Sequence, residues 1–459
     1  MDFIQHPTNR VPSKHLQYRL HMDGTTCSLE GGGTCTDTHI VIPETVSVPL
    51  ADAAPLHSVI PPETVAPGGG AVYRVTTLLN VTCYGHRNPE SVYIPASVTN
   101  MKTNALPRNS TVWVAQNNPN YTAVGGVLFT KDMRTLLHYP TSLENTSYDI
   151  PASVTAIGAW AFFGCDNLTD MKIPDSVTSI GENAFSHCAN LQNVTVGGSV
   201  TSIGENAFSW CSNLKNVQLS DSVREIGKCA FAGCDRLTGL LIPPSVITVG
   251  VCALARVGEV LVSSGNPNYA AASGVLFSKN LGTLIHVPSN FKSTVFNVPN
   301  SVSGIADRAF DGCEKLSTIN IPDSVTEIGK GAFYGCVKLT GVSIPKFIGE
   351  IAEDTFHGCK SLEKIAFPSS LKIIGIGAFS GCTRLQNVQL PRTLMGIGNN
   401  AFAGCTAFTS VSIPRSVSYV LTNAFAGCTN LTTLRINSLG TKISDGAFAG
   451  CKKLVDILY

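Results

Sequence analysis

The sequence predicts a solenoid of stacked coils with parallel β-strands and short helical or 3-10 turns, mainly β with little helix. Three observations indicate this fold class. A pattern returns every 23 residues, phenylalanine and cysteine recur at a fixed phase within it, and a block of 148 residues is present twice. A period of about 20 to 50 residues is typical of solenoids, in which each repeat packs only on its neighbours.

The 23-residue pattern is clearest in two consecutive segments, Ile173 to Thr195 (IPDSVTSIGENAFSHCANLQNVT) and Val196 to Gln218 (VGGSVTSIGENAFSWCSNLKNVQ). Eleven of the 20 phenylalanines share one phase of the pattern, and a cysteine follows each of them three residues later. Both series are predicted to be structural ladders. The phenylalanines are Phe162, Phe185, Phe208, Phe231, Phe310, Phe333, Phe356, Phe379, Phe402, Phe425 and Phe448. The cysteines are Cys165, Cys188, Cys211, Cys234, Cys313, Cys336, Cys359, Cys382, Cys405, Cys428 and Cys451.

Each coil carries the signals of two extended segments and a turn. Leu168, Met171 and Ile173 have the spacing of a strand with one buried face, and a proline follows them. A shorter extended edge comes next, and residues 181–188 (GENAFSHC) fit one helical or 3-10 turn that directs Phe185 inward. One coil cannot bury its own apolar face, so stacking is required for stability.

A larger duplication lies over the small repeat. Residues 118–121 (NPNY) and 126–131 (GVLFTK) return 148 residues later as NPNY and GVLFSK. The blocks 94–241 and 242–389 therefore look like two copies of one unit, followed by further repeats at 390–459. Each block contains a 36-residue island, at about 114–149 and 262–297, whose two apolar runs around a polar segment predict a hairpin.

Residues 1–93 do not keep the period and contain two Gly-Gly-Gly runs. We expect an irregular N-terminal segment, with a cap strand possible at Val72 to Tyr84. The chain stops at Tyr459 without a polar capping unit, so an exposed last coil is expected.

Composition excludes several classes of protein. Only 14% of residues are charged and 44% are hydrophobic, which is not the composition of a disordered chain. Thirty-two Lys and Arg balance 31 Asp and Glu, so no net field favours nucleic acid or an anionic membrane. No transmembrane segment and no secretory signal are visible in the sequence, which predicts that the protein is cytoplasmic, that it leaves the cell by another route, or that the N terminus of the sequence is incomplete.

The repeat resembles the BspA-type leucine-rich-repeat family, through the motif IPxSVTxIGxxAFxGCxxLxxV found throughout residues 94–459. This resemblance implies a leucine-rich-repeat solenoid. It also implies a cell-surface or secreted protein, because members of the family are mostly surface antigens of mucosal bacteria and protists implicated in adhesion to host matrix proteins and to other cells. The pattern differs from the horseshoe motif LxxLxLxxN, so the curvature of that class is not expected to apply.

No residue set predicts catalysis, a cofactor or a metal site. The sequence contains no HExxH, GxSxG, P-loop or CxxC pattern. The cysteine ladder is interpreted as buried packing thiols, because equivalent residues of stacked coils project in parallel and misalign for a disulfide. Cys27, Cys35 and Cys83 lie outside the ladder and could pair in an oxidising compartment. His138 and His286 occupy matching places in the islands and are interpreted as packing residues.

The polar positions of the predicted strands are the candidate partner-binding surface. They form a broad, mostly uncharged set of hydrogen-bonding side chains. Such a set suits a protein or glycan ligand, and it is equally typical of a sheet face that contacts only solvent. The candidate residues are Thr169, Asp170, Lys172, Gln192, Asn193, Thr195, Lys215, Asn216, Gln218, Gln386, Asn387 and Gln389, with Thr432, Thr433 and Arg435 further on.

Two functional hypotheses follow from these patterns. The first is a non-enzymatic adhesion or protein-recognition solenoid that binds matrix proteins, other cells or glycans through the polar strand face. The second is an intracellular scaffold for protein-protein interaction with the same fold. A competing place for the binding site is the islands, where Tyr121, Tyr269 and the segments Lys131 to Arg134 and Lys279 to Gly282 interrupt the regular surface.

Overall fold

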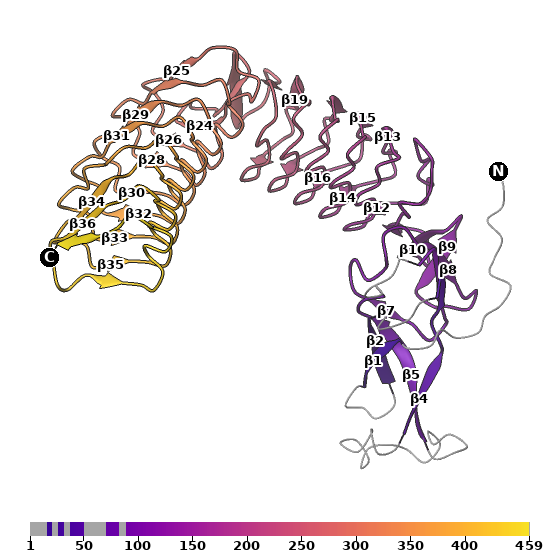
Figure 1. Cartoon of the computed structure of the whole chain (residues 1–459). Helices are drawn as coiled ribbons and strands as arrows, with labels where there is room; N and C mark the ends of the chain where they lie inside the picture. The colour runs from indigo at the N-terminus through magenta and orange to yellow at the C-terminus, as the bar shows by residue number, and fades with distance from the viewer. Residues whose placement is uncertain (1–15, 21–25, 32–36, 50–69, 82–88, 459) are drawn as a thin grey trace. The chain divides into compact units, whose positions relative to one another are not determined.

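The computed structural model describes five stretches of the chain, residues 16–20, 26–31, 37–49, 70–81 and 89–458 (Figure 1). The chain divides into two compact units, Met1–Leu214 and Lys215–Tyr459, here called the N-terminal unit and the C-terminal unit. Each unit is a stack of coils with strands and turns, and no described residue lies in a helix.

A regular coil is seen between residues 173 and 195. It contains the short strand β14 (Ser179–Ile180) and the longer strand β15 (Asn193–Thr195), joined by a hydrogen-bonded turn. In the turn, the N–H of Ala184 donates to the carbonyl of Gly181 at 3.3 Å. Ile180 and Val194 are 2% exposed, so each strand buries one face, as the spacing of apolar residues predicted.

In the N-terminal unit, the longer strands stack on one side and the short strands on another. The longer strands form what we call the long-strand face: β3 (His39–Val41), β6 (Ser91–Ile94), β8 (Thr111–Val114), β13 (Asp170–Lys172) and β15. The short strands are β7 (Asn100–Met101), β12 (Ala156–Ile157), β14 and β16 (Ser202–Ile203). Pairing is parallel and shifts by one period, for example Met171 with Val194.

The C-terminal unit repeats this arrangement, and Figure 1 shows its successive strands side by side. Its long-strand face consists of β17 (Asn216–Gln218), β19 (Leu240–Ile242), β21 (Val260–Val262), β25 (Val295–Asn297), β27 (Thr318–Asn320), β29 (Gly341–Ser343), β31 (Lys364–Ala366), β34 (Ser410–Ile413), β36 (Thr433–Ile436) and β38 (Asp456–Leu458). Its short strands are β18 (Glu225–Ile226), β20 (Thr248–Val249), β26 (Gly304–Ile305), β28 (Glu327–Ile328), β30 (Glu350–Ile351), β32 (Ile373–Ile374), β33 (Gly396–Ile397), β35 (Tyr419–Val420) and β37 (Lys442–Ile443).

Each island forms three strands where the sequence predicted a hairpin. The first island contains β9 (Tyr121–Val124), β10 (Val127–Thr130) and β11 (Thr135–His138), which pair antiparallel in chain order. The second contains β22 (Tyr269–Ala272), β23 (Val275–Ser278) and β24 (Thr283–His286) in the same arrangement. β11 then pairs parallel with β12, and β24 with β26, which returns the chain to the coil stack.

The segment before residue 94 is more regular than expected. Its described part holds β1 (Gln17–Leu20), β2 (Thr26–Gly31), β4 (Thr45–Pro49) and β5 (Gly70–Leu78), in the order β1-β2-β5-β4. β3 pairs parallel with β6, as one coil pairs with the next. The segment proposed as a cap strand overlaps β5, and its last residues, 82–84, lie outside the described part of the chain.

Stacked phenylalanine rings occupy the centre of the coils. Phe185 and Phe208 lie 5.1 Å apart between ring centroids in the N-terminal unit, and Phe333 and Phe356 lie 5.2 Å apart in the C-terminal unit. These spacings are close to the separation of about 4.8 Å between neighbouring strands, so the rings stack because the backbones do. The first six rings of the predicted ladder, from Phe162 to Phe333, are all 0% exposed. Aromatic stacking adds about 0.5 to 1.5 kcal/mol per pair beyond burial of area.

Replacing one ring in the middle of the ladder tests this packing. We expect Phe333→Ala to lower the free energy of unfolding by about 3 to 5 kcal/mol, because it leaves a cavity between the two neighbouring rings. Urea denaturation of the variant and the wild type measures the difference. Phe347→Ala is the control, since Phe347 is 60% exposed and should change stability little. Equal loss in both variants would contradict a special role of the ladder.

Candidate partner-binding surface

On the long-strand face of the N-terminal unit, polar side chains point outward from β13 and β15. Asp170, Lys172, Asn193 and Thr195 are exposed, while Met171 between the first two is 3% exposed. The amide of Asn193 donates to Asp170 Oδ1 at 2.7 Å across the two coils. Thr169 donates to the same carboxylate at 2.6 Å, and these two hydrogen bonds hold the pKa of Asp170 below its ordinary value.

The other predicted residues of these coils also lie on this face. Thr169 and Gln192 are half-buried just before the strands, and the N–H of Gln192 donates to the carbonyl of Thr169 at 2.7 Å. In the C-terminal unit, Lys215 precedes β17, and Asn216 and Gln218 lie on it; all three side chains are exposed. Thr432 and Arg435 are exposed and Thr433 is half-buried at β36.

The prediction of a strand at Gln386, Asn387 and Gln389 is wrong. The three side chains are exposed, but residues 385–391 form no strand. The amide oxygen of Asn387 accepts from the N–H groups of Thr409 and Ser410 at 2.9 and 3.1 Å. Its amide nitrogen donates to the hydroxyl groups of the same two residues. The side chain thus takes the place of the main chain as the partner of the next coil, and the regular ladder is interrupted here.

The cysteine ladder is a packing device. Cys165, Cys188, Cys211 and Cys234 are at most 1% exposed. The thiol of Cys188 donates to the carbonyl of Phe162 at 3.0 Å, and the thiol of Cys211 to that of Phe185 at 3.0 Å. Burial raises the pKa of the Cys382 thiol to about 12, which keeps this thiol protonated and able to donate to the carbonyl of Phe356.

The cysteines outside the ladder make no disulfide in the described part of the chain. Cys27 is a buried thiol. Cys35 and Cys83 lie outside the described residues. Cys229 and Cys252 occupy the same place in consecutive coils and are half-buried, and the hydrogen bond between their thiols raises the pKa of Cys252.

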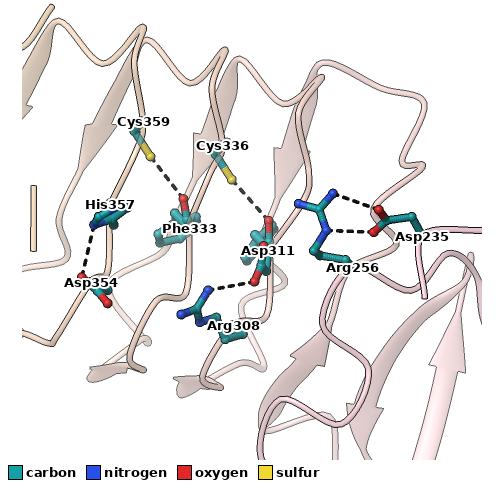
Figure 2. A network of polar contacts seen from close by, with 10 residues as sticks. Asp235, Arg256, Arg308, Asp311, Phe333, Cys336, Asp354, His357 and Cys359 are labelled. Atoms are coloured by element: carbon teal, nitrogen blue, oxygen red, sulfur yellow. Dashed lines mark hydrogen bonds and ion pairs between the residues drawn. The ribbon is translucent and has the colours of Figure 1, made fainter. Parts of the chain in front are cut away.

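A cluster of charged and aromatic side chains lies on the turns of the C-terminal unit (Figure 2). Arg256 makes two hydrogen bonds to Asp235, at 2.8 and 3.2 Å. Arg308 bonds Asp311 at 3.0 Å, and His357 lies 3.3 Å from Asp354. Two of these pairs lie within one turn and the third joins neighbouring coils, and their residues vary from coil to coil, so the repeat gave no signal for them.

Two aromatic contacts extend this cluster. The guanidinium of Arg308 lies over the ring of Tyr334, 4.0 Å from its centroid. The ring of Tyr334 in turn stacks on the imidazole of His357 at 4.7 Å. The carboxylate of Asp311 is 6% exposed, and its burial raises its pKa against the opposing effect of Arg308. The cluster fixes side chains of adjacent turns against one another and presents Arg308 at the surface.

A hollow lies beside each island. The one in the N-terminal unit measures about 250 Å³ and includes Tyr121 and His138 in its lining. The one in the C-terminal unit measures about 160 Å³ and includes Tyr269 and His286, which are the residues 148 positions later. Both tyrosines, which the sequence placed among the residues that interrupt the regular surface, are half-buried, and their hydroxyl groups accept from the N–H of Met101 and of Val249.

The two matching histidines are packing residues, as their shared position suggested. His138 bonds the carbonyl of Ser110 at 3.2 Å, and His286 bonds that of Gly258 at 3.2 Å. Burial lowers the pKa of each imidazole from 6.5 to about 4. Each ring is therefore neutral near pH 7 and donates to a carbonyl from inside the protein.

Within the described residues, no cluster of three or more His, Cys, Asp and Glu could hold a metal ion. The same part of the chain contains no helix that is long and apolar enough to cross a bilayer.

The coil stack, the fixed ladders and the exposed polar strands define a repeat solenoid. A family model described as "BspA type Leucine rich repeat region (6 copies)" matches residues 137–257, 288–375 and 349–459. The chain belongs to this leucine-rich-repeat family, as the motif indicated. The fold and the family are those of protein-interaction or adhesion-type repeat proteins.

Solved structures support the fold. A leucine-rich repeat protein from Eubacterium ventriosum is 25% identical with a TM-score of 0.61, over 71% of this chain and 93% of that one. A leucine rich cell surface protein from Faecalibacterium prausnitzii is 27% identical with a TM-score of 0.50, over 99% of this chain and 95% of that one. A search of curated proteins gives no significant match.

The depressed pKa of His286 predicts a loss of stability in acid. Its folded pKa of about 4 lies below the ordinary value of 6.5, so protonation favours the unfolded chain. The contribution of the neutral ring is complete above pH 6.5 and is lost as the pH falls toward 4, by about 3 kcal/mol. Urea denaturation at pH 7.5, 5.5 and 4 should show a smaller pH dependence for His286→Gln than for the wild type. Identical pH profiles would contradict this assignment.

Proposed function

We propose that the protein is a non-enzymatic adhesion or protein-recognition solenoid whose polar strand face binds a protein or glycan partner. The polar strand face is defined as the exposed polar side chains of the long strands and of the residues just before them. The observation that carries the proposal is the repetition of hydrogen-bonding side chains on the long strands within each unit, at Asp170, Lys172, Asn193 and Thr195 in the N-terminal unit and at Asn216 and Gln218 in the C-terminal unit.

The chemistry of this face suits an extended polar ligand. Its side chains offer donors and acceptors with little net charge, and the bond from Asn193 to Asp170 holds two of them in place before a partner arrives. Strong single contacts are scarce, since aromatic anchors are largely absent from these positions. Recognition would therefore sum many weak contacts over several coils.

A location at the cell surface follows from the family resemblance and is part of this proposal. The relative from Faecalibacterium prausnitzii is described as a cell surface protein, which supports it. The partner classes are those that the family implies, namely host matrix proteins and other cells.

A second candidate is an intracellular scaffold with the same binding face. The specific observation in its favour is that the described cysteines form no disulfide. Free thiols are typical of reducing compartments. Surface labelling of intact source cells separates the two candidates, because only a displayed protein takes up an impermeant reagent.

The polar strand face can be altered without touching the core. We expect the combination Lys172→Glu, Asn193→Arg and Thr195→Arg to weaken binding to a panel of purified matrix proteins and glycans by at least tenfold, while each change alone has a small effect. The melting temperature should stay nearly unchanged because all three side chains are exposed. Asn387 is left intact since its amide holds the next coil.

The matched control places similar changes on exposed turn positions of the same unit, Glu182→Arg, Glu205→Arg and Ser212→Arg. This control should bind as the wild type does. If the face variant also binds normally while substitutions at the island tips, such as Lys131→Glu with Arg134→Glu, abolish binding, the proposed face is wrong and the islands hold the site.

A further inference from the structure

Successive turns of the stack are joined by main-chain hydrogen bonds that run from one coil to the next. In the N-terminal unit, the N–H of Trp160 donates to the carbonyl of Glu182 at 2.8 Å, and that of Phe162 to Ala184 at 2.7 Å. The next coil repeats the pattern, with Asn183 donating to Glu205 and Phe185 to Ala207. The carbonyls of alternate residues in one turn thus receive the N–H groups of alternate residues in the turn before.

The turn that precedes the first island lacks these partners on one side. Its residues Asn104 and Leu106 lie 56 residues before Trp160 and Phe162 and occupy the same positions of the turn. The turn is joined to the preceding coil, because the N–H of Val81 donates to the carbonyl of Ala105 at 2.8 Å. Within the described residues, however, the N–H groups of Asn104 and Leu106 have no hydrogen-bond acceptor.

The second island leaves the same gap. Cys252 and Leu254 stand 148 residues after Asn104 and Leu106, and their N–H groups also lack an acceptor within the described residues. The preceding coil is again joined normally, since Phe231 donates to the carbonyl of Ala253 at 2.8 Å. The cause is the same in both cases, because each island forms three strands where a regular coil would supply a turn.

The hollow beside each island lies at this gap. In the N-terminal unit, Asn104 and Leu106 both line the hollow of about 250 Å³. Leu128 and Leu137 give it apolar walls, and Trp160 lies on the side of the next regular turn. The indole of Trp160 is held by stacking on Phe163 at 4.6 Å between centroids. The lining contains Lys102 but no carboxylate, so main-chain donors and apolar surface are what the hollow offers.

The size and the donors indicate the kind of occupant. A volume of about 250 Å³ is below the range of about 300 to 1,000 Å³ that is typical of small-molecule sites. It suits one side chain together with its flanking peptide groups. In the regular coils of this unit, two N–H groups at these positions of a turn donate to two carbonyls of the next turn. The donors of Asn104 and Leu106 therefore have the spacing that two carbonyls of a peptide turn require.

We propose that the hollow of the N-terminal unit binds a loop of a partner protein. Main-chain carbonyls of the loop accept from the N–H groups of Asn104 and Leu106, and one aliphatic or aromatic side chain packs among Leu128, Leu137 and Trp160. The loop replaces the turn that the island omits. This site is separate from the polar strand face and does not depend on it.

The duplicate hollow serves as an internal comparison. It is smaller, at about 160 Å³, and Asp307 and Arg308 stand where the first hollow has Ala159 and Trp160. A carboxylate at this position disfavours the carbonyl oxygens of a peptide, and the apolar wall is reduced. Peptide binding is therefore expected in the N-terminal unit and at least tenfold more weakly in the C-terminal unit.

The test uses the full chain with ¹⁵N-labelled leucine and the blocked tripeptides Ac-Gly-Leu-Gly-NH2, Ac-Gly-Trp-Gly-NH2 and Ac-Gly-Gly-Gly-NH2. We expect a saturable downfield shift of the Leu106 amide with the first two peptides and a much weaker response to the third. The signal is assigned by its disappearance in Leu106→Ile. Ala159→Leu, which fills the hollow from a half-buried position, should weaken peptide binding at least tenfold.

Glu182→Leu is the matched control, because it places the same side chain at the same turn position one coil later, away from the hollow. It should leave the response unchanged, and so should the polar strand face variant, which keeps this test independent of the proposed function. Absence of a saturable shift with any peptide would overturn the proposal. Equal binding by Ala159→Leu, or an equal response to acetate, would also overturn it, the latter in favour of a simple anion site.

Discussion

The whole fold depends on hydrogen bonds from the turn of one coil to the turn of the next. In the turn around Phe185, only alternate N–H groups have an acceptor within the turn. The others, those of Asn183, Phe185 and His187, donate to carbonyls of the following coil. Burial of unpaired main-chain groups is costly, so a coil is stable only with neighbours at the correct separation. That separation in turn sets the distance of 4.8 to 5.3 Å between consecutive stacked phenylalanine rings.

This constraint separates structural from functional residues. Positions that face the stack must repeat, and they are taken by phenylalanine, by cysteine thiols that donate to main-chain carbonyls, such as Cys188, and by apolar strand residues. None of these groups remains available for a partner. Recognition is left to groups that stacking does not use, namely the outward side chains of the long strands and the N–H groups at each interruption of the turns.

The repeat made the regular part of the structure predictable from sequence. Fixed phase identified Phe333 and the cysteines as buried, and the 148-residue duplication located both hairpins. The places where the structure differs from the regular repeat depend on side-chain contacts that the 23-residue period does not predict. Asn387 keeps the repeat in sequence, yet its side chain replaces the strand pairing of its coil. The paired hollows could have been anticipated from the omitted turns, whereas the ion pair between Arg256 and Asp235 arises from residues that the repeat leaves free to vary.

Amide hydrogen exchange of the free protein tests the central claim most directly. Leu106 and Phe162 occupy the same position of the turn, and both side chains are buried, at 4% and 0% exposure. Only the N–H of Phe162 has a carbonyl in the next coil. If bonds between turns hold the stack together, the amide of Phe162 should exchange at least a hundredfold more slowly than that of Leu106. Comparable protection of the two amides would contradict the account.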